Sequence, residues 1–172
     1  MACMVGIISD THGLLRPQAL AALAGCDRII HAGDIGAAHI LESLSKIAPV
    51  TAVRGNNDCG EWADRLPEYD RIEVGGACFH ILHDQALLDI DPKASGVDVV
   101  VSGHSHQPSI VWRDAVCYLN PGSAGPRRFS LPLAIARVGV GSDTIEPFIV
   151  ELPIGPAGAA GAPSRRKGAR SR

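Results

Sequence analysis

The sequence predicts an α/β fold in which two mixed β-sheets pack face to face and helices lie on the outside. In the first third of the chain, short apolar runs alternate with segments of helical periodicity, as in a parallel βαβ arrangement. From residue 69 onward, short strand-like runs follow one another with few residues between them. A pair of stacked sheets accommodates both halves, because each sheet buries one face against the other and helices cover the remaining apolar surface.

The first half contains three predicted strands joined by two predicted helices. The first helix is expected to begin at Pro17 and to end before Gly25, because proline favours the first helical turn and glycine the position after the last one. Strands followed by helices in this order form a parallel sheet. The elements are expected at residues 4–8, 17–24, 28–31, 35–47 and 50–53.

The second half is predicted to consist mainly of strands. Gly75 and Gly76 separate two strand-like runs and indicate a hairpin, because paired glycines adopt the backbone conformations of tight β-turns. At most one short helix is expected, near residues 85–94. Strands are expected at residues 69–74, 77–82, 97–103, 109–113, 115–119, 131–140 and 143–152.

Length and composition favour one soluble domain. The chain has 172 residues, of which 46% are apolar, enough for a buried core. It has no apolar run near the roughly 20 residues that a membrane-spanning helix needs, and no secretion signal is recognised. We therefore expect a cytoplasmic protein without membrane contact. The five cysteines form no Cys-x-x-Cys pair and are expected to be reduced thiols.

Charge divides the chain at about residue 152. Residues 1–152 contain 11 Lys and Arg and all 18 Asp and Glu, a formal charge of −7, whereas residues 153–172 carry five positive charges and no negative one. We expect residues 1–152 to form the domain, whose acidic surface disfavours non-specific nucleic-acid binding. Residues 153–172, rich in Pro, Gly, Ala and Arg, are expected to be a flexible tail. This tail is either a solvated terminus or a weak electrostatic tether to RNA or an acidic partner.

Five apolar runs each end in residues that can bind a metal ion. An open α/β sheet gathers its ligand site beyond the carboxyl ends of its strands, so side chains spread over 97 residues are expected to share one pocket. Three of them offer oxygen donors and four are imidazoles, a set that suits two divalent ions better than one. These residues are Asp10, His12, Asp34, Asn56, His83, His104 and His106.

Each piece of this pattern has an ordinary alternative when it is considered alone. The Asp-x-His pair is compatible with a helix cap or a turn, and the Gly-Asp and Gly-Asn pairs are common in turns. His83 alone is compatible with a partly buried histidine. The Gly-His-Ser-His segment at 103–106 is the strongest single element, because it sends two imidazoles from one loop. The joint occurrence of all pieces, each after an apolar run, favours the metal site.

Six short motifs carry a resemblance to a known family. They are DTHG at 10–13, HAGD at 31–34, RGNND at 54–58, LHD at 82–84, GHSH at 103–106 and NPGS at 120–123. Together they resemble the signature of the calcineurin-like metallophosphoesterases, and in particular the small, cap-less YfcE-type phosphodiesterases. The resemblance covers about residues 4–150 and implies a four-layer αββα sandwich.

The resemblance also implies a binuclear metal centre. Members of the family are often most active with manganese, and iron, zinc, nickel or cobalt can occupy such sites. Asn56 and His83 are expected to act catalytically by orienting the phosphate, and His31 and Asp58 to orient ligands. The first ion would be bound by Asp10, His12, Asp34 and His106, and the second by Asp34, Asn56, His83 and His104.

The sequence departs from the family pattern at two places. Asp84 follows His83 where the family usually has glycine, and the stretch from His83 to Val97 is short, which predicts a more open site. Asn57 stands where larger phosphatases of the superfamily have a histidine, so no side chain is expected to protonate the leaving group. Good leaving groups such as phenols are therefore favoured. We expect the substitution Asn57→Ala to have only a modest effect.

These observations predict an enzyme that hydrolyses small phosphodiesters with a water or hydroxide activated by two divalent metals. One alternative is a non-catalytic scaffold similar to the retromer subunit that shares this fold and has lost catalytic histidines; here His12, His83, His104 and His106 are all present. Another is a nuclease recruited to a polymer by the basic tail, which the acidic domain disfavours. Exposed strands are compatible with a homodimer.

Overall fold

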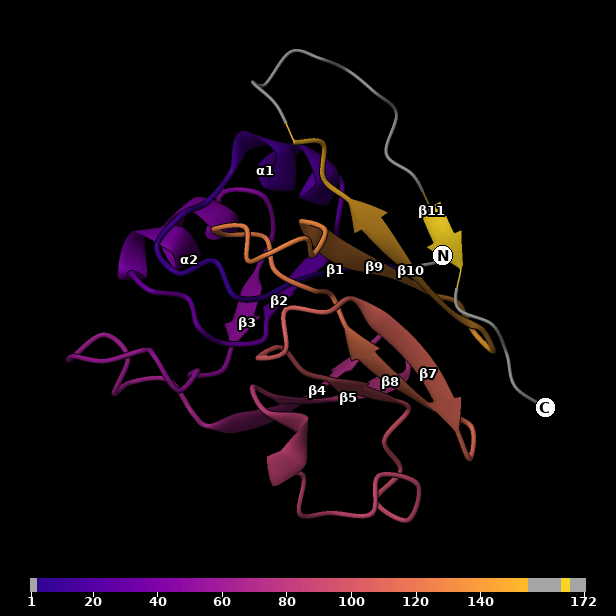
Figure 1. Cartoon of the computed structure of the whole chain (residues 1–172). Helices are drawn as coiled ribbons and strands as arrows, with labels where there is room; N and C mark the ends of the chain where they lie inside the picture. Colours follow the sequence, from indigo (N-terminus) through magenta and orange to yellow (C-terminus); the bar gives the residue numbers. More distant parts are fainter. Residues whose placement is uncertain (1–2, 155–164, 168–172) are drawn as a thin grey trace.

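Two mixed β-sheets stack face to face in this protein (Figure 1). The structure is a computed structural model that describes residues 3–154 and 165–167. One sheet has the strand order β11-β10-β9-β1-β2-β3 and the other has the order β4-β5-β6-β8-β7. The predicted pair of mixed sheets is therefore confirmed.

The first sheet is built from the two ends of the chain. Its parallel part comprises β1 (Cys3–Ile8), β2 (Arg28–His31) and β3 (Val50–Ala52). Next to β1, β9 (Ala134–Val140) runs antiparallel, followed by β10 (Ile145–Glu151) and β11 (Arg165–Lys167). The parallel part places the carboxyl ends of β1, β2 and β3 on the same edge of the sheet.

The second sheet contains the middle of the chain. The strands β4 (Tyr69–Val74) and β5 (Ala77–Leu82) form the predicted hairpin. The strand β6 (Val99–Val101) runs parallel to both β5 and β8 (Val116–Asn120), and β7 (Ser109–Arg113) pairs antiparallel with β8 at the edge. The carboxyl ends of β5 and β6 thus lie on one edge of this sheet.

The main core lies between the sheets. Alternate residues of β1, such as Val5 and Ile7, meet Phe79 and Ile81 of β5 in one buried cluster. The other face of the first sheet is covered by α1 (Pro17–Leu23) and α2 (Ala38–Ser45), which bury apolar residues against β1, β2 and β9. This burial follows the period-two pattern of strands that have both faces covered.

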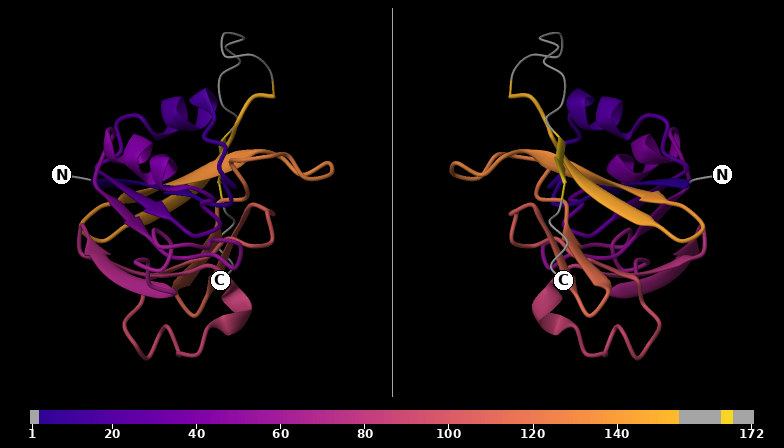
Figure 2. Two further views of the ribbon diagram at one scale, coloured as in Figure 1. Left: turned by 90° about the vertical axis from the view of Figure 1, so that its left-hand side faces the viewer. Right: turned by 90° about the vertical axis from the view of Figure 1, so that its right-hand side faces the viewer.

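The outer face of the second sheet is covered by a short irregular segment. It contains the 3-10 helix η1 (Gln85–Leu87), and Leu88 and Ile90 pack against a small buried cluster around Leu82 and Val100. This segment belongs to the short stretch between His83 and Val97, where at most one short helix is expected, and η1 is that helix. The four-layer sandwich is therefore confirmed, with a thin fourth layer, and Figure 2 shows this segment projecting from the second sheet.

The helix α2 begins three residues later than the predicted start at residue 35. Gly36 has φ of 87°, a left-handed conformation that interrupts helical geometry, and a Cβ at this position would collide with the backbone of His12 and Gly13. Close packing against the loop after β1 therefore sets the start of α2.

Only part of the predicted tail lies within the described residues. Among residues 153–172, the structure describes 153–154 and the strand β11, whose backbone pairs with β10 at Phe148, Ile149 and Val150. The prediction that the tail is flexible otherwise falls outside the described part of the chain. Within that part, helices are too short or too polar to cross a bilayer.

Candidate metal centre

All seven predicted ligands lie in loops that follow the carboxyl ends of strands. The first sheet supplies four of them from the loops after β1, β2 and β3, and the second sheet supplies three from the loops after β5 and β6. The two sheets thus present their ligands at a common edge of the sandwich, as expected for α/β sheets.

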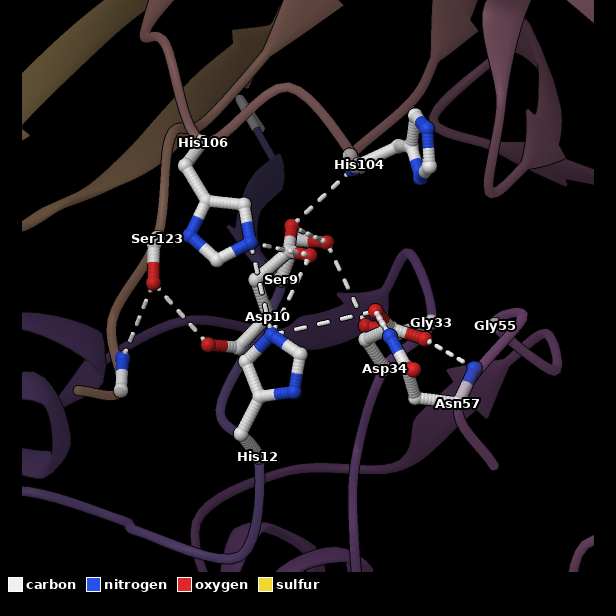
Figure 3. A network of polar contacts seen from close by, with 12 residues as sticks. Ser9, Asp10, His12, Gly33, Asp34, Gly55, Asn57, His104, His106 and Ser123 are labelled. Carbon is white, nitrogen blue, oxygen red and sulfur yellow. Dashed lines mark hydrogen bonds and ion pairs between the residues drawn. The ribbon is translucent and has the colours of Figure 1, made fainter. Parts of the chain in front are cut away.

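One group of ligand atoms gathers around Asp10, His12 and His106. The Oδ1 atom of Asp10 lies 3.2 Å from Nε2 of His106 and 3.8 Å from Nε2 of His12. The two imidazoles stack with ring centroids 5.3 Å apart. Figure 3 shows both rings directed toward the same carboxylate. One carboxylate oxygen and two imidazole nitrogens within 4.8 Å of one another can hold a divalent ion.

A second group adjoins the first and contains Asp10, Asp34 and His83. Nε2 of His83 lies 3.4 Å from Oδ2 of Asp34. The same Asp34 oxygen lies 3.8 Å from Nε2 of His12, which belongs to the first group. Asp10 is common to both groups, and Asp34 contacts both, so two carboxylates lie between the two candidate ion positions.

Asn56 and His104 extend the second group toward solvent. Oδ1 of Asn56 lies 3.0 Å from Nε2 of His83 and 3.1 Å from Nδ1 of His104. The His104 ring is half-exposed and points away from His12 and His106, whereas its backbone amide donates to Oδ2 of Asp10 at 3.1 Å (Figure 3). The structure therefore brings together all seven predicted residues, with His104 at the periphery.

Five of these seven residues adopt a left-handed backbone conformation. Asp10, His12, Asp34, His104 and His106 have φ between 46° and 66°, whereas only three other non-glycine residues in the described part of the chain have positive φ. This conformation costs about 1–2 kcal/mol per residue and concentrates at functional sites. The strain shows that tertiary contacts hold these loops in place.

The environment of the Asp10 carboxylate suits a cation. Its carboxylate is fully buried, and burial raises its pKa. Oδ2 accepts hydrogen bonds from Ser9 Oγ at 2.7 Å and from the His104 amide, but Oδ1 has no hydrogen-bond partner within the described structure. A buried carboxylate oxygen without a hydrogen bond is costly, and a bound cation would remove that cost. The residues present therefore fit a divalent metal ion.

Asp34 is held as a carboxylate by direct hydrogen bonds. Burial alone would raise its pKa, but hydrogen bonds from His83 and from Asn57 outweigh burial and hold the pKa of Asp34 well below its usual range. The Asn57 backbone amide donates to Oδ1 at 2.9 Å, and its side-chain amide donates to Oδ2 at 2.6 Å. Asn57 therefore fixes both oxygens of a candidate ligand.

Two of the buried histidines, His83 and His106, have pKa values shifted in opposite directions. Burial would lower the pKa of His83, but its contacts with Asp34 and with the Ala32 carbonyl raise it. A carbonyl can only accept, so Nδ1 of His83 carries the hydrogen that bonds to Ala32 at 2.7 Å, which directs Nε2 toward Asp34. Burial lowers the pKa of His106 and favours the neutral imidazole that binds metals.

A buried chain of hydrogen bonds supports the loop that carries Asp10 and His12. The amide of Gly33 donates to Nδ1 of His31 at 3.3 Å, so Nε2 of His31 carries the hydrogen and donates to Thr11 Oγ1 at 2.9 Å. The Thr11 hydroxyl in turn donates to the Ile35 carbonyl at 2.9 Å. Burial lowers the pKa of His31 to about 3, which keeps the ring neutral.

Asp58 supports the site through backbone amides. Its two oxygens accept from the amides of Gly36 at 2.8 Å and Gly55 at 2.9 Å. The loop after β3 therefore packs closely against Asp34. A Cβ on Gly55 would collide with the backbone nitrogen and Oδ1 of Asp34. Glycine at this position permits the close approach.

The sequence of residues 3–143 matches the calcineurin-like phosphoesterase superfamily domain. The chain is a member of this superfamily. It is 36% identical over 133 residues to a probable metallophosphoesterase of Methanocaldococcus jannaschii, which covers 70% of this chain and 67% of that protein. It is 29% identical over 137 residues to a phosphodiesterase of the same organism, covering 69% of this chain and 82% of that one.

The fold of this superfamily member is also similar to that of vacuolar protein sorting 29 from Cryptosporidium parvum. The TM-score is 0.77 at 19% sequence identity, over 96% of this chain and 98% of the other. This likeness shows that the two proteins share a fold. The expectation of a calcineurin-like domain, made from the six motifs, is thus confirmed by the relatives and by the architecture.

Several residues of this phosphoesterase domain that support the site were not singled out from the sequence. Ser9 bonds directly to Asp10, and Thr11 joins the loop after β1 to His31. Asn120, the first residue of the NPGS motif, also supports the site, because its side-chain amide donates to the Gly103 carbonyl of the Gly-His-Ser-His loop at 2.6 Å. In the sequence, only the positions of Ser9 and Thr11 on either side of Asp10 indicate that they support the site.

Proposed function

We propose that this protein hydrolyses phosphodiester bonds with two divalent metal ions, most suitably manganese. The observation that carries the proposal is the position of Asp10 and Asp34 between two groups of imidazoles, with one Asp10 oxygen lacking a hydrogen-bond partner among the described residues. In this assignment, Asp10, His12, Asp34 and His106 hold one ion. Asp34, Asn56, His83 and His104 hold the other.

The donor set supports divalent cations of the first transition series. Imidazole nitrogens and carboxylate oxygens together suit manganese, iron, cobalt, nickel and zinc, whereas calcium and magnesium prefer oxygen ligands alone. No cysteine of the described chain belongs to the two groups, so a thiolate-bound structural zinc site is not supported. When bound, two such ions acidify a water molecule and neutralise phosphoryl oxygens.

The side chains of the protein contribute positioning and electrostatics. The Ala32 carbonyl fixes the orientation of the His83 ring, and Asn57 fixes both oxygens of Asp34. Asn56 contacts His83 at the solvent side of the second group, where the two side chains would orient the phosphate. Preorganised polar groups of this kind lower the barrier without rearranging during the reaction.

Two observations support a phosphodiester over a phosphomonoester as the substrate. One is the relative named a phosphodiesterase, and the other is Asn57, the residue after Asn56. At that position Asn57 is engaged with Asp34 and offers no acid to a leaving group. Substrates with acidic alcohols, such as phenols, are therefore expected to react fastest.

Hydrolysis of bis-p-nitrophenyl phosphate tests this function. The full chain is stripped of metal and assayed with manganese, zinc, cobalt or nickel, beside the variant Asp10→Asn. We expect metal-dependent turnover by the wild type and a loss of at least about 1000-fold in the variant, because the substitution removes the negative charge that Asp10 would offer to the first ion. Lack of turnover with every metal would contradict the proposal.

A non-catalytic scaffold is the second candidate, favoured by the fold shared with vacuolar protein sorting 29. Retention of all four histidines at the site argues for the enzyme. Metal binding without any hydrolysis of phosphodiesters or monoesters would support the scaffold instead.

A further inference from the structure

A cavity of about 500 Å³ adjoins the second group of ligands. It is lined by Asn56, His83 and His104, by further residues of the loop after β3 such as Arg54, and by residues of β4, β5 and the η1 segment. A volume of this size holds a small organic molecule rather than a water cluster alone. The cavity therefore continues directly from the position at which a phosphate would be held.

The lining of this cavity includes large apolar side chains that are not covered by the protein. Tyr69 at the start of β4 is 65% exposed and Leu87 at the end of η1 is 75% exposed. Leu82, which pairs with Tyr69 across the hairpin, is buried and also lines the cavity. The Tyr69 ring stacks on His80, with centroids 6.0 Å apart. These contacts present an aromatic and aliphatic surface beside the metal centre.

The charged groups of the cavity are mostly negative. Asp84 and Asp89 line it, together with Glu68. Among the described residues, Arg54 is the only arginine or lysine of its lining, and its guanidinium is engaged by Glu68 at 2.9 Å and by Asp64 at 3.5 Å. Burial lowers the pKa of the nearby His80 and disfavours its cationic form. A second anionic group would therefore find no unengaged arginine or lysine in the described lining.

We propose that this cavity binds the organic group of one of the two esterified alcohols of the substrate. This group is uncharged or cationic and has an aromatic or apolar face. The inference rests on the proposed function, because the cavity is assigned as a substrate site through its continuity with the metal centre. Tyr69 and Leu87 would provide the contact surface, and Glu68, Asp84 and Asp89 would exclude additional phosphates or carboxylates. Small aryl or alkyl phosphodiesters are thereby favoured over polynucleotides.

The apolar part of the proposal is tested by equilibrium binding of two phosphate monoesters that differ in the organic group. Phenyl phosphate and methyl phosphate are titrated into the full chain with saturating manganese. We expect a preference for phenyl phosphate of at least about tenfold in the wild type, equivalent to about 1.4 kcal/mol. In the double variant Tyr69→Ala/Leu87→Ala, this preference should fall below about threefold.

The matched control is Val111→Ala, which removes an exposed apolar side chain on β7 that does not line the cavity. It should leave the preference unchanged. Equal affinity of the wild type for the two esters, or an unchanged preference in the double variant, would overturn the assignment of the cavity.

The charge part is tested with 4-carboxyphenyl phosphate. We expect it to bind at least about threefold more weakly than phenyl phosphate, and Asp89→Asn to reduce that difference. Equal binding in the wild type would overturn this part of the proposal. If no phosphodiester is hydrolysed but the phenyl preference is present, the proposed function fails and the cavity assignment stands. If phosphodiesters are hydrolysed but the phenyl preference is absent, the proposed function stands and the cavity assignment fails.

Discussion

At the scale of single residues, the proposed chemistry depends on two carboxylates, Asp10 and Asp34, whose environments differ. Asp10 is fully buried, which raises its pKa, and one of its oxygens has no hydrogen-bond partner in the described part of the chain and is available to a cation. Asp34 receives hydrogen bonds from His83 and Asn57, which lower its pKa. A metal ion would complete the coordination of Asp10, whereas the protein itself already orients Asp34 for one.

The contacts of Asn57 predict a larger mutational effect than the sequence alone suggests. Asn57→Ala removes the side-chain hydrogen bond to Oδ2 of Asp34 while leaving the backbone one. We expect a loss of about 10-fold to 100-fold in metal affinity or activity, typical for groups that orient metal ligands. Titration of manganese into the metal-free protein measures this loss of affinity. Glu61→Ala, at an exposed position, is the control. An unchanged manganese affinity would show that this hydrogen bond does not orient the ligand.

His31 predicts a specific dependence of stability on pH. Its pKa is about 3 in the folded protein and about 6.5 when unfolded, so between these values the unfolded chain binds a proton that the folded chain does not. This contribution is fully present above pH 6.5 and is lost as the pH falls toward 3, at about 1.4 kcal/mol per unit.

Urea unfolding of the metal-free protein between about pH 4 and pH 7 measures this slope. His31→Gln should reduce it, whereas His39→Gln, at an exposed histidine, should leave it unchanged. The same slope in wild type and His31→Gln would contradict a buried neutral His31.

At the scale of elements, the loops after the strands are fitted against one another. The loop after β3 contacts Asp34 in the loop after β2, and the loop after β1 is held by His31 at the end of β2. These contacts hold the loops in which Asp10, His12 and Asp34 keep left-handed backbone conformations. Each loop is determined by its neighbours more than by its own sequence.

Gly55→Ala tests this fit between loops. The added Cβ would collide with the backbone and carboxylate of Asp34, so we expect activity to fall by at least about 100-fold through displacement of that ligand. Gly139→Ala is the control, because its Cβ would meet no atom of the described structure closer than 3.8 Å. Assays of both variants with bis-p-nitrophenyl phosphate decide the matter. Comparable activity in the two variants would argue against the close approach.

Strand ends and loop contacts differ in how far the sequence predicts them. The ends of the strands could be predicted, because apolar runs stop where the buried sheet stops. These ends correctly place the seven predicted metal-binding residues, Asp10 and His106 among them, in the loops that follow the strands. The start of α2 could not, because it depends on the contact of Gly36 with the loop after β1. The hydrogen bonds of Ser9 to Asp10 and of Asn57 to Asp34 could not be predicted from the sequence either, because the tertiary structure places these partners.

At the scale of the whole molecule, the site joins the two sheets. The first sheet supplies Asp10, His12, Asp34 and Asn56, and the second supplies His83, His104 and His106. Bound ions would therefore cross-link the two halves of the sandwich and offset the cost of the left-handed backbone at five ligands. Metal binding is expected to be coupled to the stability of the fold as a whole.

This coupling predicts a shift of the thermal midpoint. Manganese at about 100 times its dissociation constant should stabilise the fold by about 2.7 kcal/mol for each ion bound, and one such ion alone corresponds to a rise in Tm of about 5–10 °C for a domain of this size. Differential scanning calorimetry with manganese and with a chelator measures the shift. The same Tm in both conditions would show that the ions do not join the sheets.

The most direct test of the proposed binuclear centre is the metal stoichiometry of the protein. Equilibrium dialysis against manganese, followed by elemental analysis, should give two ions per chain for the wild type. Asp34→Asn should retain less than one ion and lose nearly all activity, because this carboxylate contacts the ligands of both positions. One ion or none in the wild type, or two ions retained in Asp34→Asn, would contradict the account.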